Sequence, residues 1–520
     1  MIDVLVIGSG GAGLVAALRS VEMGATVKVV SKSLPTRSQT SMAQGGINAA
    51  LGNHGEDSVQ LHYEDTLKSA QGLGDANMIR MMSESAIEAI AWLDRIGVPF
   101  SRTAEGKIAQ RRLGGASAAR ACYSQDYTGL KILHTLYDAC NKADVAFVNE
   151  RFLLDFVCTE GSVTGATFLN LKTGEVELIE AKSVIVATGG YSRVYHKHST
   201  NASGSTGDGI AAALRAGAKL SDLEFVQFHP TGLKNSSILI SESARGAGGH
   251  LLNAKHERFT NELAPRDVLA AAIYDEIEHG SGAVYLDIRH LGEAFIDEEL
   301  PQERKLARLY EGIDPVHELI PIKPVAHYTM GGIDVDATTQ SSIKGLYAIG
   351  ECANQKVHGA NRLGGNSLLE LIVFGKISAQ EASEFAKNRT DVAFDTQQFE
   401  KDKKYIEAIK NYEKRIDFYE KHHMMADVFY KDAGISRDKV SVAAALEMVQ
   451  ELQNNIPLMG PKDSSKVYNT NLVEFLEFTN MLALSEVMLQ GALARNESRG
   501  AHSRRDIPEK NDTDYGGHTI

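Results

Sequence analysis

The sequence predicts an α/β protein in which a parallel sheet is interrupted by an inserted α+β segment and is followed by a helical region. Apart from Asp3, residues 2–7 form an aliphatic run without polar alternation, which is typical of a strand buried on both faces of a parallel sheet. Similar runs recur at 183–190 and 345–351, on either side of a long polar stretch at 222–336. From 387 onward the apolar residues recur at helical spacing. A domain that is interrupted by an insertion gives this order of elements.

A glycine-rich turn follows the first strand directly. Residues 8–13 read Gly-Ser-Gly-Gly-Ala-Gly, a helix is expected over 14–23, and a second strand over 24–30. The first glycine of such a motif permits the tight turn, the second lets the backbone approach a pyrophosphate, and the third lets helix and strand pack closely. The amides at the start of the helix then face the phosphates. We therefore expect a dinucleotide site at Gly8, Ser9, Gly10, Gly11, Ala12 and Gly13.

The second strand closes at Ser31 and Lys32. In NAD-binding proteins an acidic residue usually stands at this place and binds the ribose hydroxyls. The sequence therefore disfavours an ordinary NAD site. The next segment, 34–52, is rich in Gly, Ser, Thr and Gln and too polar for a core, so we expect a loop that wraps a ligand.

The remaining elements follow from apolar spacing and turn residues. A helix is expected at 78–96, where the apolar residues recur at helical spacing and a glycine follows. Two strands are expected at 146–157 and 163–171, joined by a Glu-Gly turn, and another helix at 366–386.

The helical region and the tail complete the chain. We interpret 387–495 as a helical bundle that supports the rest, with one apolar stripe formed by Val440, Ala443, Ala444, Met448 and Leu452. The last 25 residues are polar and irregular. The expected division is a nucleotide-binding domain in two parts, 1–222 and 337–386, a capping domain at 223–336, a helical domain at 387–495 and a tail at 496–520.

Composition excludes some classes of protein. The chain has 520 residues and a formal net charge of −13, which argues against binding to nucleic acid. Its four cysteines, Cys122, Cys140, Cys158 and Cys352, include no close pair, so we expect no disulfide framework, iron-sulfur cluster or metal site, and a reducing compartment. No apolar run reaches the roughly 18 residues of a membrane span. Met1 leads straight into the first strand, so we expect no export signal and a cytoplasmic location.

A series of polar and glycine-rich motifs follows the glycine turn along the chain. They occupy 31–32, 36–47, 187–190, 206–209, 227–232, 264–267, 326–332, 358–364 and 497–502. In this order they resemble the flavoprotein subunit of succinate dehydrogenases and fumarate reductases. The resemblance implies an FAD-binding Rossmann-like domain that is interrupted by a capping α+β domain and followed by a helical domain.

FAD is the cofactor that the resemblance implies. Its pyrophosphate is expected on Gly8 to Gly13, its ribose near Ser31 and Lys32, and its flavin against the 38–46 loop. The further cofactor-binding residues implied are Ser38, Gln39, Thr40, Gln44, Gly45, Gly46, Asp208, Glu351, Ser367 and Leu368. Glu351 also ends a predicted buried strand, which is the usual position for ligand contacts in α/β sheets.

A small dicarboxylate is the substrate that the resemblance implies, bound by His229, Ser241, His327 and Arg362. Arginine holds carboxylates bidentately, and histidine or hydroxyl donors complete the shell. By the same resemblance, Arg266 supplies a proton through a relay with Glu242 and Arg245. The residues alone would have nominated Glu242 as the acid, because the pKa of arginine lies far above neutrality.

Three features depart from the family pattern. Gln39 stands where membrane-bound members have a histidine joined covalently to the flavin, so we expect non-covalent FAD and a bias toward fumarate reduction. Ser241 replaces the usual threonine, which keeps the hydroxyl and loses a methyl group. The chain ends at Ile520, earlier than most relatives, and this leaves the docking of a partner open.

Partners and alternative functions also follow from the resemblance. An iron-sulfur subunit and a quinone-reactive membrane anchor are expected, which would place this chain peripherally on the cytoplasmic face of the inner membrane. The first alternative is L-aspartate oxidase, a close relative. That enzyme has an asparagine where this chain has Val226 and an acidic residue where it has Leu113, which cannot pair with a substrate ammonium. The second is a catalytically silent FAD-binding assembly protein, which would not need Arg266, Glu242 and Arg362.

Overall fold

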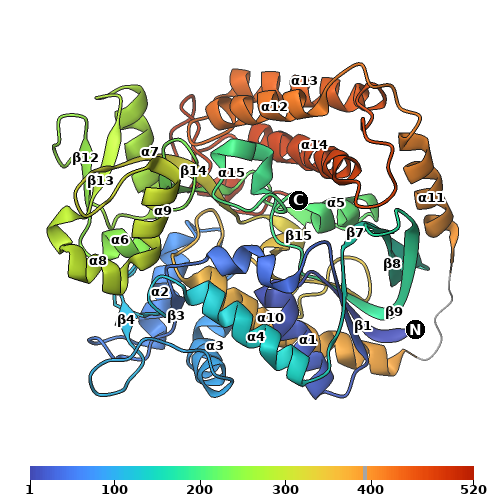
Figure 1. Ribbon diagram of the computed structural model, residues 1–520, viewed down its shortest axis with the longest axis horizontal. Coiled ribbons are helices and arrows are strands. Elements are labelled where there is room, and N and C mark those ends of the chain that lie inside the picture. The colour runs from blue at the N-terminus through green and yellow to red at the C-terminus, as the bar shows by residue number, and fades with distance from the viewer. Residues whose placement is uncertain (390–394) are drawn as a thin grey trace.

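The structure, a computed structural model, describes residues 1–389 and 395–520 (Figure 1). Its central sheet has seven strands. Five of them run parallel in the order β6-β2-β1-β9-β16. These strands are β1 (Ile2–Ile7), β2 (Val27–Ser31), β6 (Ala146–Asn149), β9 (Val176–Val186) and β16 (Leu346–Ala348). The other two, β7 (Arg151–Thr159) and β8 (Ser162–Asn170), form a hairpin that pairs antiparallel with the first half of β9.

The register of the parallel strands brings their carboxyl ends together. Ile7 of β1 stands opposite Val30 of β2 on one side and Val186 of β9 on the other. Ala348 of β16 also stands opposite Val186. The segments that leave these strands therefore emerge at one edge of the sheet, which is where α/β proteins bind ligands.

Helices cover the faces of this sheet, and one of them starts at the glycine turn. Strand β2, residues 4–7 of β1 and residues 183–186 of β9 are largely buried, as their apolar runs predicted. Gly375 of α10 lies so close to α1 that an added Cβ would come within 2.9 Å of Val15. The helices of this part are α1 (Gly11–Glu22), α2 (Val59–Ser69), α3 (Ala76–Arg95), α4 (Thr128–Lys142), α5 (Asp208–Arg215) and α10 (Asn366–Asn388).

A separate antiparallel sheet lies between β9 and β16 in the sequence and occupies the yellow-green part of Figure 1. Its order is β11-β14-β13-β12, with strands β11 (Val226–Leu233), β12 (His250–Asn253), β13 (Val284–Asp287) and β14 (Ile320–Thr329). The helices α6 (Glu242–Gly246), α7 (Arg266–Glu278), α8 (Glu293–Glu299) and α9 (Pro301–Glu311) accompany it. Two small sheets contain β3 (Ile47–Asn48), β4 (Gln110–Arg111), β5 (Ala121–Cys122), β10 (Leu220–Ser221), β15 (Gly332–Asp334) and β17 (Ala353–Asn354).

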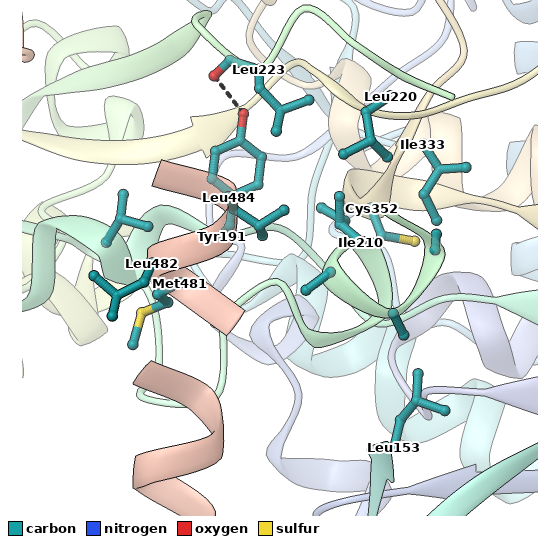
Figure 2. Close-up of a cluster of buried hydrophobic side chains, with 14 of the residues drawn as sticks. Leu153, Tyr191, Ile210, Leu220, Leu223, Ile333, Cys352, Met481, Leu482 and Leu484 are labelled. Carbon is teal, nitrogen blue, oxygen red and sulfur yellow. Dashed lines mark hydrogen bonds between the residues drawn. The ribbon is translucent and has the colours of Figure 1, made fainter. Parts of the chain in front are cut away.

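The C-terminal part is helical, as the spacing predicted. It contains α11 (Gln397–Ile409), α12 (Phe418–Asp432), α13 (Lys439–Asn454), α14 (Thr470–Ala494) and the short α15 (Asp512–Tyr515). The longest, α14, packs into the core of the central sheet: Met481, Leu482 and Leu484 are buried in one cluster with Leu153 of β7 and Ile210 of α5 (Figure 2). In the ranges that the structure describes, none of the helices combines the length and the apolar character needed to cross a bilayer.

Three details differ from the sequence predictions. The run at 146–157 is two strands, because Glu150 has a φ of 63° and turns the chain, so that β6 pairs with β2 and β7 with β8. The buried face of α13 is Val442, Ala445, Val449 and Leu452. Val440 is 80% exposed and Ala444 is exposed as well, so only Leu452 of the predicted stripe belongs to the buried face.

The tail is the third difference. It is irregular but not peripheral, because Glu497, Arg499, His502 and Arg504 are buried. Arg495 pairs with Glu224 at 2.8 Å and with Glu497 at 3.0 Å, so the segment that leads into β11 is tied to the tail.

Candidate functional site

One elongated cavity of about 610 Å³ opens at the carboxyl edge of β1 and β2 and extends to the inserted sheet. Almost all of the predicted site residues line it. These are Gly8, Ser9, Gly10, Gly11, Ala12, Ser31, Lys32, Ser38, Gln39, Thr40, Gln44, Gly45, Gly46, Asp208, Glu351, Ser367, Leu368, His229, Ser241, Glu242, Arg266, His327 and Arg362. Gly13 and Arg245 do not contribute to the lining.

The glycine turn brings backbone, not side chains, to the cavity. Gly8 has a φ of 109°, and a Cβ there would lie 2.1 Å from the carbonyl oxygen of Ala187. A Cβ on Gly13 would lie 2.0 Å from the carbonyl oxygen of Gly8. Gly13 therefore acts by letting α1 pack on the turn, and not by touching a ligand. The helix begins at Gly11 with no side-chain cap from Gly10, as a phosphate-binding helix start requires.

Polar side chains that face the cavity leave acceptors and donors unused. Within residues 1–389 and 395–520, the buried atoms Ser38 Oγ, Gln44 Oε1 and Thr188 Oγ1 of the cavity wall have no hydrogen-bond partner. A native protein rarely leaves buried polar atoms unsatisfied, so these atoms indicate a polar ligand. Ser38 and Gln44 lie in the predicted flavin loop, while Gln39 accepts a 2.8 Å hydrogen bond from the amide of Ala202.

Glu351 lies between the cofactor part and the inserted sheet. Its Oε1 accepts hydrogen bonds from the amide of Thr329 at 3.0 Å and from its hydroxyl at 3.2 Å. Burial raises the pKa of Glu351 to about 7, against the effect of these hydrogen bonds. Ser367 and Leu368, in the first turn of α10, complete this wall.

Arg266 and Glu242 form a buried ion pair at the other end of the cavity. Arg266 Nη2 donates to Glu242 Oε2 at 2.6 Å, and its Nη1 donates to Gln227 Oε1 at 3.2 Å. The amide of Gly114 donates to the second carboxylate oxygen of Glu242. Burial alone would raise the pKa of Glu242, but Arg266 and Arg245 outweigh it and lower the pKa. The carboxylate therefore stays ionised and holds Arg266 in place.

Arg245 stands behind this pair. It is 1% exposed, and its Nη1 donates to the carbonyl oxygen of Glu262 at 2.5 Å. Its Nε and Nη2 have no partner among the described residues. Burial lowers the pKa of Arg245, and Glu242 opposes this shift. Arg245 does not line the cavity, and its charge acts on the buried Glu242.

Arg362 is the second cation of this end. Its side chain lies over the ring of Tyr328, 4.4 Å from the ring centre, and its buried Nε has no hydrogen-bond partner in the described ranges. Burial, followed by the charge of Arg266, lowers the pKa of Arg362 to about 9. A buried guanidinium with unused donors that faces a cavity is a binding site for an anion, and a carboxylate matches its planar fork.

His229 and His327 complete the polar wall as neutral side chains. Their ring centres are 4.9 Å apart. Burial and the neighbouring arginines lower both pKa values well below the ordinary range. The amide of Thr231 donates to His229 Nδ1 at 3.2 Å, so the ring proton is on Nε2 and can be donated.

The Ser241 hydroxyl has a second role that the sequence did not reveal. It caps α6 by accepting a 3.1 Å hydrogen bond from the amide of Ser243, and it lies 2.8 Å from the Ser243 hydroxyl. It still lines the cavity. Its position is therefore fixed by the helix start.

Sequence reasoning missed several wall residues. Tyr328 lies in the 326–332 motif, so its place in the cavity wall could have been predicted from the sequence. Glu474 and Glu477 of α14 also line the cavity, and no local pattern marked them. The contacts of Lys32 were also not foreseen, because its ammonium donates to Asp208 and Glu477 at 2.6 Å each.

The comparisons with known proteins agree with this site. Residues 3–368 match the family described as FAD binding domain, and residues 422–520 match the one described as fumarate reductase flavoprotein C-term. The chain is 40% identical to the succinate dehydrogenase flavoprotein subunit of Rickettsia bellii over its whole length, covering 92% of that protein. The chain belongs to the succinate dehydrogenase and fumarate reductase flavoprotein family.

Two further relatives support the same assignment. One is the 8-methylmenaquinol:fumarate reductase flavoprotein subunit of Wolinella succinogenes, which is 40% identical over the whole of this chain and 88% of its own. The other is a solved structure of E. coli quinol fumarate reductase, with a TM-score of 0.95 and 35% identity, which covers 99% of this chain and 93% of that chain. This member of the family is an FAD-dependent oxidoreductase. Its glycine turn and the unsatisfied polar atoms around the cavity fit FAD.

Proposed function

We propose that this chain interconverts succinate and fumarate and binds the dicarboxylate between Arg362, Arg266 and the two histidines. The observation that carries the proposal is the buried, unsatisfied Arg362 that shares a cavity with Arg266. Two carboxylates of one small substrate need two groups of donors, and the Ser241 hydroxyl and His229 Nε2 are the additional ones. FAD is held by Gly8 to Ala12, Ser31, Ser38, Gln39, Thr40, Gln44, Gly45, Gly46, Asp208, Glu351, Ser367 and Leu368. Gly13 and Lys32 support this site through contacts within the protein.

The protein groups have distinct roles in the proposed reaction. FAD, when bound, supplies the hydride transfer. Arg362 and the neutral histidines hold and polarise a substrate carboxylate, in a site from which water is largely excluded. Arg266 delivers or removes the proton at the neighbouring carbon, and Glu242, 2.6 Å from Arg266, restores its protonation state. Arg245 extends this relay away from the cavity.

Direction and partners are part of the same proposal. Gln39 cannot form the covalent link that raises the reduction potential of a flavin. This chain should therefore reduce fumarate more readily than it oxidises succinate. Electrons would come from an iron-sulfur subunit docked on a quinone-reactive membrane anchor, on the cytoplasmic face. The names of the relatives, which include subunits of quinol and menaquinol fumarate reductases, support this assignment. We also propose that residues 223–336 form the capping domain.

L-Aspartate oxidase remains the competing function. Leu113 lines the cavity at the place where an ammonium-binding acid would be needed. Transfer of an unpaired ammonium from water into the cavity would cost roughly several kcal/mol of binding free energy. Aspartate should therefore be a poor substrate. A silent assembly protein is disfavoured by the intact Arg266–Glu242 pair.

Steady-state turnover with purified protein tests these functions. Fumarate reduction by a reduced dye, with weaker succinate oxidation and no detectable oxidation of aspartate, is expected. Aspartate turnover faster than either dicarboxylate reaction would reject the proposal, and no turnover with all three would favour the assembly protein. Co-purification in mild detergent tests the partners, because a flavoprotein that is repeatedly isolated alone and fully active with a soluble donor would refute them.

A further inference from the structure

The helical region supplies part of the cavity wall. Thr470, Val473, Glu474 and Glu477 of α14 line the same cavity as the glycine turn. Their spacing places them on one face of the helix, over its first two turns. The match to the FAD binding domain family ends at residue 368, so this wall lies outside the part of the chain to which cofactor binding is assigned.

Lys32 connects this helix to the cofactor part. Its Nζ donates to Glu477 Oε1 at 2.6 Å, to Asp208 Oδ2 at 2.6 Å and to Thr206 Oγ1 at 2.9 Å. An ammonium group has three donors, so none remains for the ribose hydroxyls. Burial opposes the charge of Lys32, but Asp208 and Glu477 outweigh it and raise its pKa. The lysine therefore stays charged and joins three segments of the chain.

A second contact lies one turn further along α14. Asn480 Nδ2 donates to the other carboxylate oxygen of Asp208 at 2.9 Å. Beyond this residue the helix is anchored by the buried Met481, Leu482 and Leu484 (Figure 2). Leu472, Phe475 and Leu476 of the first two turns are buried in the same core. The helix is therefore anchored along its length, and only its other face, with Thr470, Glu474 and Glu477, is turned to the cavity.

The position of Lys32 indicates which half of the cofactor this helix covers. Lys32 directly follows β2, whose carboxyl end receives the adenosine ribose in dinucleotide-binding folds. We propose that Thr470 to Glu477 form an adenosine lid, which the contacts Glu477–Lys32 and Asn480–Asp208 hold closed over the adenosine half of FAD. FAD enters and leaves only when these contacts open.

The charges around Lys32 make the lid testable without breaking the fold. Two carboxylates share one ammonium, and the side chains of Lys32, Asp208 and Glu477 are 23%, 8% and 13% exposed. Loss of the Glu477 carboxylate leaves Lys32 paired with Asp208. The substitution therefore opens the lid contact and leaves no buried charge alone.

The experiment measures FAD release from the holoprotein as the rise of flavin fluorescence after dilution. Glu477→Ala and Asn480→Ala should each release FAD at least tenfold faster than the wild type. Glu486→Ala is the matched control, because Glu486 lies on the same helix but accepts hydrogen bonds from Gln450 and Gln453 of α13. Release from Glu477→Ala within twofold of the wild type, or equal acceleration in Glu486→Ala, would overturn the proposal.

Two further measurements keep the test decisive. Glu477→Gln serves as a second variant if Glu477→Ala cannot be purified with FAD. It keeps one acceptor for Lys32 and should give an intermediate release rate. A rate equal to that of the wild type would count against the lid. The absorption spectrum of the bound flavin should be unchanged in every variant, because the contacts lie at the adenosine end. A shifted flavin spectrum would place them at the other end and reject the assignment.

Discussion

Arg362 lies over the aromatic ring of Tyr328 at 4.4 Å, and the Tyr328 hydroxyl donates a 2.6 Å hydrogen bond to Glu370. The ring thus supports the cation without neutralising it, and the guanidinium edge stays free for a ligand. His358 Nε2, 2.8 Å from the same Glu370 oxygen, fixes the carboxylate in turn. The anion site is therefore built from behind by an aromatic ring and a buried carboxylate.

Dicarboxylate binding should follow the charge of Arg362. Because the pKa of Arg362 is lowered to about 9, its cation is complete below that pH and is lost as the pH rises through it. The dissociation constant of malonate, a competitive dicarboxylate, should be constant near neutrality and increase above pH about 9. Arg362→Met should weaken malonate binding by at least 100-fold, or about 3 kcal/mol, and remove this pH dependence.

Tyr328 provides the matched pair of variants for this site. Tyr328→Phe keeps the ring and should change malonate binding less than threefold, whereas Tyr328→Leu removes it and should cost about 1–2 kcal/mol. Equal effects of the two substitutions would show that the ring does not support Arg362. Unaltered malonate affinity in Arg362→Met would contradict the whole assignment.

Arg266 should be needed for turnover and not for the cofactor. Arg266→Ala removes the proton donor, so kcat should fall by at least 1,000-fold, as expected for loss of general acid catalysis (about 10²–10⁴-fold) and of polarisation. FAD should remain bound at the wild-type ratio, measured by absorbance. Turnover within tenfold of the wild type would refute the role.

Glu242→Gln separates positioning from proton transfer. The amide keeps the shape and one acceptor for Arg266 but cannot take a proton, so malonate should bind within about fivefold of the wild type while kcat falls by about 100-fold or more. Loss of malonate binding in parallel with kcat would instead mean that Glu242 only positions Arg266.

Two buried acids at the contact between α9 and the cofactor part should make stability depend on pH. Asp126 Oδ2 accepts hydrogen bonds from the amides of Gln302 and Glu303, and Glu303 Oε1 accepts one from the amide of Ser241. Burial raises the pKa of Asp126 to about 6, and burial together with Asp126 raises that of Glu303 well above its ordinary value. Arg111 opposes both shifts.

The sign of the effect follows from linkage. An acid whose pKa is raised by folding binds its proton more tightly in the folded state, so its contribution to stability is complete below pH about 4 and is lost as the pH rises through 6. For Asp126 the loss is about 3 kcal/mol at most. Glu303→Gln should therefore raise Tm at pH 8 and leave it almost unchanged at pH 4. The control is Glu298→Gln, an exposed acid on α8, and a Tm at pH 8 below that of the wild type would contradict the prediction.

The sequence predicted the parts of the fold that depend on local pattern. Residues 4–7 and 183–186 are buried strands because an unbroken apolar run is stable only between two covered faces, and Gly97, with a φ of 104°, ends α3 as expected. The break at Glu150 was not predicted, although Asn149, Glu150 and Arg151 are polar, because no glycine or proline marks the turn and a positive φ is uncommon at a non-glycine residue. The face of α13 was misassigned because alanines lie on several of its sides.

The candidate site was predictable where the family motifs are contiguous. Arg266, Arg362 and His229 each lie in one of these motifs, and all three line the same cavity. The contact of Glu477 could not be predicted, because Glu477 meets Lys32 across 445 positions of the sequence and lies in a mainly apolar helix that is buried on several sides. The buried tail was missed because arginines in an irregular polar segment are usually exposed. Here Arg499 is buried in an ion pair with Glu497, and Arg504 in one with Asp506.

The last prediction concerns Gln39, which lines the cavity and is fixed by the amide of Ala202 at 2.8 Å. A carboxamide is too weak a nucleophile to bond to the flavin, so FAD should be held without a covalent link. In the described part of the cavity wall the histidines are His229 and His327, which lie beside Arg266 and Arg362, and neither His54 nor His62 contributes. His62 is buried instead against Asn366 at 3.0 Å.

Acid precipitation followed by fluorescence of pellet and supernatant tests this directly: all of the FAD should appear in the supernatant. Without the electron-withdrawing link the reduction potential should be low, so fumarate reduction should exceed succinate oxidation when both are measured with matched dyes. Gln39→His is the informative variant, because a ring nitrogen at this place can form the link, and it should shift the ratio toward succinate oxidation. FAD in the wild-type pellet would refute the non-covalent assignment, and a wild-type excess of succinate oxidation would overturn the predicted direction even if the flavin is released.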